Sequence, residues 1–599
     1  MKPQNPELFF NFKDTSGTKK PVMFKDPIDI ISTSNIDEVL PYLERVQDYV
    51  NAGYYAAGYL AYEAAPAFEP EFKVNTDGSQ TLLWYGIFTK PTYESLSSAG
   101  DFSIKEWTAS EPADHYQKSI EHIKNLIELG DTYQVNYTIR MNSTFTGDTK
   151  AYYTQLAQAQ AADYSAFIQT ADHTILSASP ELFFQMCKGK ITTRPMKGTA
   201  QRGLTYKEDN RRATWLAASE KNRAENVMIV DLLRNDLGTI AKPGTVQVPK
   251  LFSIEKYPTV YQMTSTITAT TEEDISLTDV FKALFPCGSI TGAPKISTMR
   301  IIQELETSPR GVYCGAIGYI TPEQEAIFNV PIRTVTIDHE DNCAKYGVGG
   351  GITWDSTSEG EYDEIITKSA LLKRKQPEFQ LLESIGLVHG SYLVLENHME
   401  RLEKSAWYFN FSIDIEEIRK ELMKCASTHS NDKWKVRLLV DQDGQFTCEA
   451  VQIIHDSIDE VTAVLANAAV SSEDVFLYHK TTNRSVYKKA KASHPDVYDV
   501  LLWNEKKEVT EFTAGNVVMQ INDQFFTPPI ECGLLGGTFR KKLIDSGKIA
   551  ERIIRVDELK DCECIWFINS VREWIPVKLH EKRKLLGARA RQKKRRHQS

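Results

Sequence analysis

Hydrophobic positions along the chain follow two periods, one of two residues and one of about 3.6, which are typical of strands and helices. In the first part of the chain, alternation predicts strands over Tyr164–Leu176, Phe183–Thr193, Val260–Thr270, Arg310–Ile320 and Ile327–Asp338. Helical spacing predicts helices over Ala113–Glu128, Tyr206–Asp231, Val280–Phe285 and Lys295–Glu306. Because the strands cluster in runs and do not alternate strictly with helices, the pattern favours an α+β fold.

The later part of the chain shows the same mixture after a charged, proline-containing stretch. The pattern predicts strands near Val436–Val440, Asp499–Trp503 and Val517–Ile521, and a helix over His398–Asn410. Lys373–Glu378 combines clustered charge with a proline and follows a helix-like segment, which is typical of a linker. We therefore expect a first domain over 1–375, a second over 376–577, and a tail over 578–599.

The composition argues against a membrane-spanning or a secreted protein. The chain has 599 residues, 41% of them hydrophobic, without a long uninterrupted apolar run or an apolar segment after the first lysine. This pattern predicts neither a membrane span nor a secretory signal. Nine scattered cysteines without a CxxC pair are typical of the reducing cytoplasm, where we expect the protein.

Charge is distributed unevenly. The net charge is −10, but the segment from Lys578 to Ser599 holds ten basic residues against one acid. The remaining body is therefore strongly acidic, which argues against nucleic-acid binding as the main function. We interpret the tail as a solvated, disordered segment.

Five segments of the first domain occur in an order that is specific as a set. They are SPELFF (Ser179–Phe184), RPMKGTAQRG (Arg194–Gly203), NRAENVMIVDLLRNDLG (Asn222–Gly238), FPCGSITGAPK (Phe285–Lys295) and GVGGGITWDSTSEGEYDEIITK (Gly347–Lys368). The set resembles the chorismate-utilising family, which includes anthranilate, aminodeoxychorismate and isochorismate synthases. The resemblance implies an anthranilate-synthase-like fold of antiparallel sheets flanked by helices. The glycine spacing matches neither a dinucleotide fingerprint nor a P-loop.

Carboxylates on a predicted helix indicate a metal site. Glu361 and Glu364 are three residues apart, so both side chains lie on one helix face, and carboxylates suit Mg²⁺. The family resemblance adds Glu225 to this set and implies that Mg²⁺ is held against a substrate carboxylate. A solvated acidic face is the alternative reading of these residues.

One lysine indicates which chorismate chemistry to expect. Lys197 stands where aminodeoxychorismate synthases carry lysine and most relatives carry alanine, and a buried lysine can act as a nucleophile. By resemblance, Lys197 attacks the ring, and Glu181 is the general acid for the departing hydroxyl. Gln134 replaces the lysine base of water-using relatives, which suits ammonia as the incoming nucleophile.

The remaining substrate contacts are implied by the resemblance. The glycines allow backbone N–H groups to approach an anion closely. The implied substrate-binding residues are Gln134, Thr291, Tyr313, Arg333, Gly349, Gly350, Gly351 and Lys368. Two positions depart from the family pattern: Gln262 replaces a histidine, and Asn222 replaces an acidic residue. We see no Cys-His-Glu amidotransferase triad, so ammonia is expected from a glutamine amidotransferase subunit or from solution.

Four segments of the second domain resemble class IV pyridoxal-phosphate enzymes, a group that contains aminodeoxychorismate lyase and amino-acid aminotransferases. They are ENHMERLEKS (Glu396–Ser405), FLYHKTTNRSVY (Phe476–Tyr487), EVTEFTAGNVVM (Glu508–Met519) and CGLLGGTFRK (Cys532–Lys541). The resemblance implies a class IV α+β fold, pyridoxal phosphate as cofactor, and the cofactor-binding residues Lys480, Glu511, Arg401, Gly537, Thr538 and Phe539. Lys480 is the implied catalytic lysine. The first strands of this fold are nearly absent before Leu382.

Together the two resemblances imply that chorismate and ammonia are converted to 4-aminobenzoate, with the second domain acting as a lyase. An amino-acid aminotransferase or an inactive scaffold in place of the lyase stays open. The class IV resemblance also allows a homodimer formed through the second domain.

Overall fold

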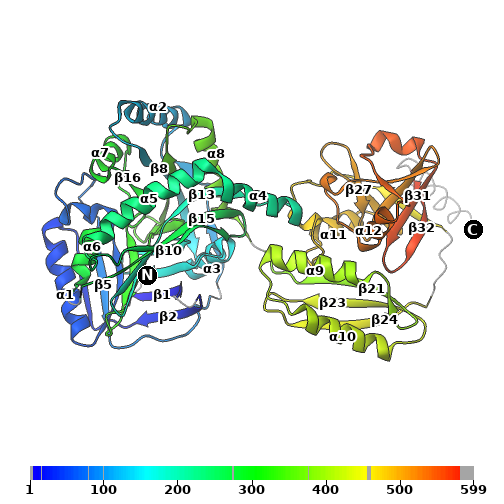
Figure 1. Ribbon diagram of the computed structural model, residues 1–599, viewed down its shortest axis with the longest axis horizontal. Helices are drawn as coiled ribbons and strands as arrows, with labels where there is room; N and C mark the ends of the chain where they lie inside the picture. Colours follow the sequence, from blue (N-terminus) through cyan, green and yellow to red (C-terminus); the bar gives the residue numbers. More distant parts are fainter. Residues whose placement is uncertain are drawn as a thin grey trace, which may run out of the picture. The chain divides into compact units, whose positions relative to one another are not determined.

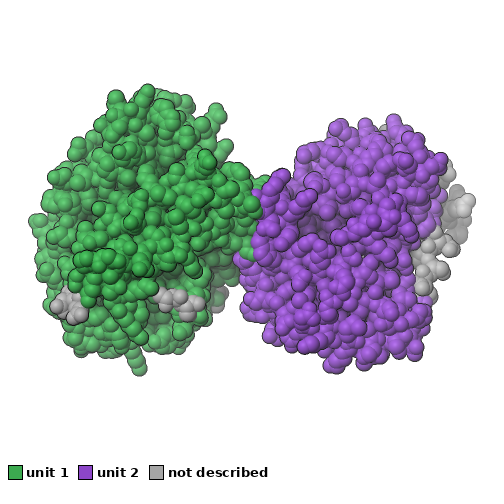
Figure 2. Space-filling view, in the orientation of Figure 1, with its two compact units in different colours: residues 1–202, 212–376 green, residues 203–211, 377–599 purple. Residues whose placement is uncertain are grey.

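The computed structural model describes residues 5–14, 17–78, 80–98, 100–272, 275–375, 377–454 and 460–580. They form two compact units, one of residues 1–202 and 212–376, the other of residues 203–211 and 377–599 (Figure 2). The chain passes between the units after residue 376, within the predicted linker, but the second unit also takes the segment 203–211. None of the helices in these ranges is long and apolar enough to cross a membrane.

Two antiparallel sheets build the first unit. The first sheet has the order β16 (Gly292–Ala293), β8 (Gln134–Gly147), β20 (Cys343–Ile352), β19 (Thr334–Asp338), β10 (His173–Ser179), β9 (Tyr164–Gln169), β1 (Glu7–Lys13) and β2 (Lys19–Lys25), with β6 (Phe102–Ile104) and β7 (Thr108–Ala109) paired to β8. The second has the order β13 (Met196–Gln201), β15 (Val260–Thr270), β12 (Lys190–Arg194), β11 (Leu182–Cys187), β18 (Ala326–Asn329), β17 (Ala316–Ile320), β4 (Tyr55–Leu60), β5 (Leu83–Phe88) and β3 (Asp29–Thr33), with β14 (Gln247–Lys256) paired to β15.

Strand alternation places each sheet between two apolar layers. Along β4, Ala57 and Tyr59 join a core shared with β1 and β10 of the other sheet, whereas Ala56 and Leu60 face the opposite way. These opposite faces are covered by helices (Figure 1). The second sheet is covered by α1 (Val39–Asn51), α5 (Glu220–Gly238) and α6 (Leu277–Leu284), and the first by α2 (Ala113–Leu129), α3 (Thr149–Gln160), α7 (Lys295–Leu305) and α8 (Ser358–Ser369).

The second unit contains two further sheets. The smaller has the order β22 (Ser391–Tyr392), β21 (Leu381–Val388), β23 (Lys433–Val440) and β24 (Phe446–Gln452), and its apolar face carries α9 (Leu395–Phe409) and α10 (Ile415–Thr428). The larger has the order β27 (Val509–Phe512), β26 (Asp499–Trp503), β25 (Val461–Leu465), β32 (Glu573–His580), β31 (Cys564–Asn569), β28 (Asn516–Ile521), β29 (Gln524–Thr527) and β30 (Ala550–Glu551). The helices α11 (Ser485–Ala492) and α12 (Thr538–Asp545) complete this unit.

Several predicted elements are divided or shortened. The predicted helix Tyr206–Asp231 is two helices, α4 (Tyr206–Ala218) and α5, because the Ser219 hydroxyl caps α5 by accepting the N–H of Asn222. The predicted strand Arg310–Ile320 begins only at Ala316, since Arg310 enters a buried ion network. The predicted tail begins inside β32, which continues to His580, and the rest of the tail lies outside the described residues.

Candidate functional site

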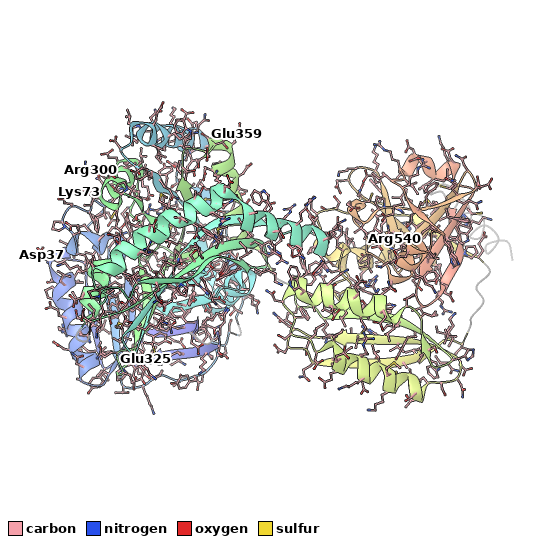
Figure 3. All side chains as sticks on the ribbon, viewed as in Figure 1. Asp37, Lys73, Arg300, Glu325, Glu359 and Arg540 are labelled. Atoms are coloured by element: carbon pink, nitrogen blue, oxygen red, sulfur yellow. The ribbon has the colours of Figure 1, made fainter. Side chains whose placement is uncertain are left out.

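A cavity of about 250 Å³ lies in the first unit, lined by residues of β8, β13, β20, α5 and α8. Glu359, labelled in Figure 3, marks the first turn of α8. The structure gathers all of the predicted site residues of this unit around the cavity except one. Those that line it are Gln134, Glu181, Lys197, Glu225, Tyr313, Arg333, Gly349, Gly350, Gly351, Glu361, Glu364 and Lys368.

Thr291 is the exception. Its hydroxyl donates to the carbonyl oxygens of Cys287 at 3.2 Å and Gly288 at 3.3 Å, and its own carbonyl accepts the N–H of Asn136 at 2.8 Å. This fully buried side chain stabilises the wall behind the cavity. The Thr291 side chain therefore does not line the cavity, and its contact with a substrate, which the family resemblance implies, stays a prediction.

Two of the four glycines of β20, Gly350 and Gly351, leave room for the side chains around the cavity. A Cβ atom on Gly350 would lie 3.0 Å from Glu361 Oε2, and one on Gly351 would lie 3.1 Å from Lys197 Nζ and collide with the Gln134 amide. Strand β19 pairs with β20 only through Ala344–Tyr346, so the backbone edge farther along β20 is not covered by β19. This edge therefore offers close approach and backbone groups to a bound anion.

Lys197 lies in β13 at an irregularity in the pairing with β15, where side-chain amides hold the backbone. The Gln262 amide donates to the carbonyl oxygen of Gly198 at 2.9 Å, and the Asn226 amide donates to that of Lys197 at 3.4 Å. Gly198 has a φ of 93°, which favours glycine at this irregularity of the strand. Burial lowers the pKa of the Lys197 amine, while the carboxylates of Glu225 and Glu181 oppose the shift. A lowered pKa makes the neutral, nucleophilic amine more accessible.

Two polar groups beside Lys197 are buried with unsatisfied atoms. Glu181 is 2% exposed, and burial raises its pKa to about 7 despite Ser289 and Lys197 nearby. Gln134 is 1% exposed, and neither its amide oxygen nor its amide nitrogen has a partner among the described residues; the same holds for Glu181 Oε1. Because unsatisfied buried polar atoms cost free energy, these three atoms are ready to bind a ligand in the cavity.

Carboxylates and cations face each other on the α8 side. Lys368 Nζ lies 2.5 Å from Glu364 Oε1 and donates to the carbonyl oxygen of Gly349 at 2.7 Å. The Ser356 hydroxyl donates to Glu361 at 2.6 Å. Burial raises the pKa of Glu361 and of Glu225, and the like charge of Glu364 raises both further. A cation placed among these carboxylates would relieve their repulsion.

A buried ion network supports the opposite wall. Arg310 donates to Glu306 at 2.6 and 3.0 Å and to the carbonyl oxygens of Asn136 and Ile290, which line the cavity. Arg140 donates to Glu306 at 3.0 Å and stacks over the ring of Tyr313. This network was not predicted from the sequence, because nothing local shows that Arg140, Glu306 and Arg310, which lie far apart or in different elements, are buried and paired.

The second unit holds a larger cavity of about 480 Å³, lined by all of the cofactor-binding residues predicted there: Arg401, Lys480, Glu511, Gly537, Thr538 and Phe539. Burial lowers the pKa of Lys480 to about 7, and the cations Arg401 and Arg484 contribute. Burial raises the pKa of Glu511 to about 7. The Glu511 carboxylate accepts hydrogen bonds from Tyr487 Oη at 2.8 Å, Asn516 Nδ2 at 3.2 Å and the N–H of Leu535 at 3.2 Å.

A buried network fixes Arg401 at the edge of this cavity. Glu383 on β21 accepts two hydrogen bonds from Arg401, at 2.5 and 2.9 Å, and lies 2.7 Å from His398 Nδ1. The other ring nitrogen of His398 lies within hydrogen-bonding distance of the hydroxyls of Ser570 and Thr538. The Arg401 guanidinium and the His398 imidazole hold the pKa of Glu383 at about 2. Of this group, the sequence indicated Arg401 and Thr538 but not Glu383, His398 or Ser570.

Gly537 caps the N-terminus of α12, next to Arg540, which Figure 3 labels. A Cβ atom at this glycine would lie 1.8 Å from Asn516 Oδ1, so no larger residue fits without rearrangement. The first N–H groups of a helix bind anions well. Together with Arg401 and the Thr538 hydroxyl, this turn forms a cradle for an anion such as phosphate.

Comparison with known proteins gives a family match for each of the two units. Residues 91–374 match the model of chorismate binding enzymes, and residues 380–579 match that of class IV amino-transferases. The chain joins a chorismate-binding domain to a class IV amino-transferase domain. This finding confirms both family resemblances and the predicted α+β fold class.

Three relatives illustrate the match of the chorismate-binding unit. Aminodeoxychorismate synthase component 1 of Escherichia coli is 42% identical over 277 residues, which cover 46% of this chain and 60% of the relative. The Bacillus subtilis protein of the same name is 38% identical over 262 residues, covering 44% of this chain and 55% of the relative. The chain thus spans 55–60% of the length of these two relatives.

The third relative is a solved structure and shows the fold alone. The structure assigned to a 2,3-dihydroxybenzoate-specific isochorismate synthase of Bacillus anthracis is 19% identical, with a TM-score of 0.51. It covers 61% of this chain and 95% of its own chain. Its fold agrees with the two-sheet architecture of the chorismate-binding unit.

A class IV amino-transferase domain implies pyridoxal phosphate, and the second cavity fits this cofactor. Lys480 offers an amine whose pKa of about 7 leaves a substantial fraction neutral near neutral pH, Glu511 offers a carboxylate for the pyridine nitrogen, and the turn at Gly537 offers the anion cradle. The three groups line one cavity.

The first cavity fits Mg²⁺ more loosely. Among the described residues, no group of three or more acidic, histidine or cysteine side chains is arranged to hold a metal ion. Glu225, Glu361 and Glu364 nevertheless line the same cavity. Burial and the charge of Glu364 raise the pKa of Glu361 and of Glu225, whereas the charge of Lys368 lowers the pKa of Glu364. Because Mg²⁺ is often held by one or two carboxylates together with substrate oxygens and water, these residues fit an ion bound with a substrate and do not form a preformed cage.

Proposed function

We propose that the chain converts chorismate and ammonia to 4-amino-4-deoxychorismate in the first cavity, and that compound to 4-aminobenzoate and pyruvate in the second. The observation that carries the proposal is the position of Lys197, an amine of lowered pKa in one cavity with Glu181 and Gln134. The names and identities of the bacterial relatives support it.

The first reaction follows from these residues. The neutral Lys197 amine attacks ring carbon 2 of chorismate while the 4-hydroxyl leaves as water with a proton from Glu181. Ammonia then attacks carbon 4 and expels the lysine, which restores the amine. Gln134 lacks the basicity to activate water, but its oxygen can accept a hydrogen bond from ammonia. Glu225, Glu361 and Glu364 would hold Mg²⁺, which would neutralise a substrate carboxylate.

Ammonia requires a source. The two bacterial relatives are each named component 1, which implies a further component in those proteins. We infer that a glutamine amidotransferase subunit supplies ammonia to this chain as well, and that ammonium salts replace it in vitro.

The second reaction needs proton transfer at a substrate carbon. Bound pyridoxal phosphate supplies an electron sink for the loss of pyruvate. Lys480 can hold or release a proton near neutral pH, since its pKa is about 7. Glu511, held by Tyr487 and Asn516, would orient the cofactor ring, and Arg401 with the turn at Gly537 would bind its phosphate.

A product assay tests the proposal. The purified chain, loaded with pyridoxal phosphate, is incubated with chorismate, ammonium and Mg²⁺, and 4-aminobenzoate and pyruvate are measured by chromatography. We expect both products in equal amounts. Chorismate consumption without 4-aminobenzoate would restrict the proposal to the first cavity. In a separate assay, transfer of an amino group from an added amino acid to an added oxo acid would identify the second cavity as an aminotransferase site.

The glutamates on α8 yield a prediction about Mg²⁺. Replacing Glu361 or Glu364 with glutamine removes a charged ligand, so we expect aminodeoxychorismate formation to fall roughly 10²-fold or more and its stimulation by Mg²⁺ to disappear. Glu359→Gln is the matched control, because Glu359 lies on the same helix, is exposed and does not line the cavity. If Glu361→Gln and Glu364→Gln kept the parent activity, these glutamates would not bind Mg²⁺, and the solvated acidic surface would be the correct interpretation of this helix face.

The raised pKa of Glu181 predicts a pH dependence. A general acid must be protonated, and with a pKa of about 7 the protonated fraction of Glu181 falls tenfold per pH unit above that value. We therefore expect the turnover rate of chorismate to decline on the alkaline side. Glu181→Gln should lower turnover by roughly 10²- to 10⁴-fold and remove this alkaline decline. If the turnover rate of the variant still declined at alkaline pH, a group other than Glu181 would cause the decline.

A further inference from the structure

The strand that carries Lys197 contains a bulge. The register of β13 with β15 shifts between Met196 and Thr199, so Lys197 and Gly198 together face a single residue of β15. A bulge interrupts the hydrogen bonds of a sheet, bends the strand and re-aims its side chains. The conformation of this bulge therefore determines where the Lys197 amine lies in the first cavity.

Two side chains that line the cavity meet at the glycine of this bulge, and they are the two positions at which the sequence departs from the family pattern, Gln262 and Asn222. The Gln262 amide donates to the carbonyl oxygen of Gly198 at 2.9 Å and accepts the Thr199 hydroxyl at 2.9 Å. A Cβ atom on Gly198 would lie 3.0 Å from both Cβ and Oδ1 of Asn222, so the Asn222 side chain packs directly against this backbone. Both departures thus act at one residue, next to the predicted nucleophile.

The other peptide group of the bulge is also held by a side chain. Asn226 donates to the carbonyl oxygen of Lys197 at 3.4 Å and accepts the Ser265 hydroxyl at 2.5 Å. Asn226 directly follows Glu225 on α5, so the helix that carries a candidate magnesium ligand also holds the backbone of the nucleophile. Side-chain amides from a helix and from a strand therefore restrain both carbonyl groups of the bulge.

We propose that Gln262 and Asn222 are positioning residues for the Lys197 amine: they fix the bulge at Gly198 and thereby hold the amine at the ring carbon that it attacks. The inference rests on the proposed function of the first cavity and names the residues that hold its nucleophile. Both the oxygen and the nitrogen of the Gln262 amide are engaged within β13, so proton donation to the departing hydroxyl is left to Glu181.

Replacing Gln262 with methionine tests the positioning role, because methionine keeps the length of the side chain and removes both hydrogen bonds. Misplacement of a reacting group by about 1 Å can cost roughly 10²-fold in rate, so we expect Gln262→Met to slow formation of the covalent adduct on Lys197 about tenfold or more. The affinity for chorismate, measured by calorimetry, should stay within a few-fold of the parent value. Rapid quenching and intact-protein mass spectrometry without ammonia measure the adduct.

The matched control for this variant is Gln247→Met, because Gln247 is exposed on the neighbouring strand β14 and does not line the cavity. The control should keep the parent rate, and thermal unfolding of both variants should match the parent chain. A loss of chorismate affinity in Gln262→Met as large as the loss of rate would indicate a binding role and overturn the inference.

A double-mutant cycle tests whether the two side chains act at the same place. Asn222→Ala should slow adduct formation several-fold. If both residues act by fixing Gly198, the double variant Gln262→Met/Asn222→Ala should be little slower than Gln262→Met alone, because the second change removes a restraint that is already lost. A loss equal to the product of the two single losses would show independent effects and overturn the joint role.

Gln262→His separates positioning from direct action on the departing hydroxyl. Histidine can still donate to the carbonyl oxygen of Gly198, so this variant should recover part of the rate that Gln262→Met loses and stay at or below the parent rate. A rate above that of the parent chain would show that this position acts on the hydroxyl and would overturn the inference. If the parent forms the adduct and Gln262→Met forms it equally fast, the inference is overturned and the proposed reaction stands. If the parent forms no adduct, the nucleophile assignment in the proposed function fails and the inference fails with it.

Discussion

Lys197→Ala should lower aminodeoxychorismate formation by roughly 10³-fold or more while leaving the affinity for chorismate within a few-fold of the parent value. The amine is needed for the covalent step only, whereas Lys368, Arg333 and the glycine edge of β20 remain in the cavity to bind the dianion. Rapid-mixing kinetics measures the first change, and calorimetric titration with chorismate measures the second. Intact-protein mass spectrometry should show an adduct of chorismate minus water on the parent chain when ammonia is withheld, and none on the variant.

Lys190→Ala is the matched control for this experiment, because Lys190 is exposed on β12 of the same sheet and does not line the cavity. A Lys197→Ala chain that formed aminodeoxychorismate at the parent rate would show that ammonia attacks chorismate directly. Lys197 would then contribute to binding only. The presence of lysine in place of the alanine of most relatives would not distinguish the amination reaction.

Most of the candidate site was predictable because ordered motifs supplied context that single residues lack. Taken alone, Lys197 would be read as a surface lysine, but the motif RPMKGT marks it as a site residue, and the structure shows the backbone of β13 at Lys197 and Gly198 held by Asn226 and Gln262. Gln262 replaces the histidine of the family pattern and has a structural role here. Its amide donates to the carbonyl oxygen of Gly198 and accepts a hydrogen bond from the Thr199 hydroxyl. The glycines of β20 were predictable as an anion-approach site, although the sequence did not show that packing against Lys197 and Glu361 requires them.

The rest of the site depends on contacts between residues far apart in the chain. The pairing of Glu383 with His398 and Arg401 joins β21 to α9, and no local pattern marks Glu383 as buried. Thr291 shows the opposite case, because its motif indicates a site but its hydroxyl is used within the backbone turn.

Secondary structure was predicted best where a regular hydrophobic pattern continued over many residues without interruption. The strand Val260–Thr270 has the predicted bounds, and the helix predicted over Ala113–Glu128 ends one residue later at Leu129. Errors arose where a cap or turn interrupts a continuous pattern, as at Ser219 between α4 and α5. Tyr164–Leu176 likewise folds into two strands joined by a turn, since Thr170 and His173 hydrogen-bond to each other there.

Lys480→Ala should stop 4-aminobenzoate formation and remove the cofactor absorbance, while aminodeoxychorismate accumulates at a near-normal rate. Pyridoxal chemistry needs the lysine both to hold the cofactor and to move a proton at the substrate carbon, so we expect a loss of roughly 10³-fold or more. The first cavity uses Lys197, Glu181 and Gln134 and needs none of these groups. Chromatography of both products and the cofactor spectrum provide the two readouts, with Lys489→Ala on the exposed side of α11 as control.

Mixing two full-length variants extends this test without cutting the chain, which is preferable because residues 203–211 belong to the second unit. A mixture of Lys197→Ala and Lys480→Ala chains contains one intact cavity of each kind on different molecules. If the two cavities act independently, aminodeoxychorismate released by the second variant is converted by the first, so 4-aminobenzoate appears after a lag that shortens as the protein concentration rises. Loss of chorismate consumption in Lys480→Ala alone would contradict the assignment of the two reactions to separate cavities, because the first cavity is intact in that variant.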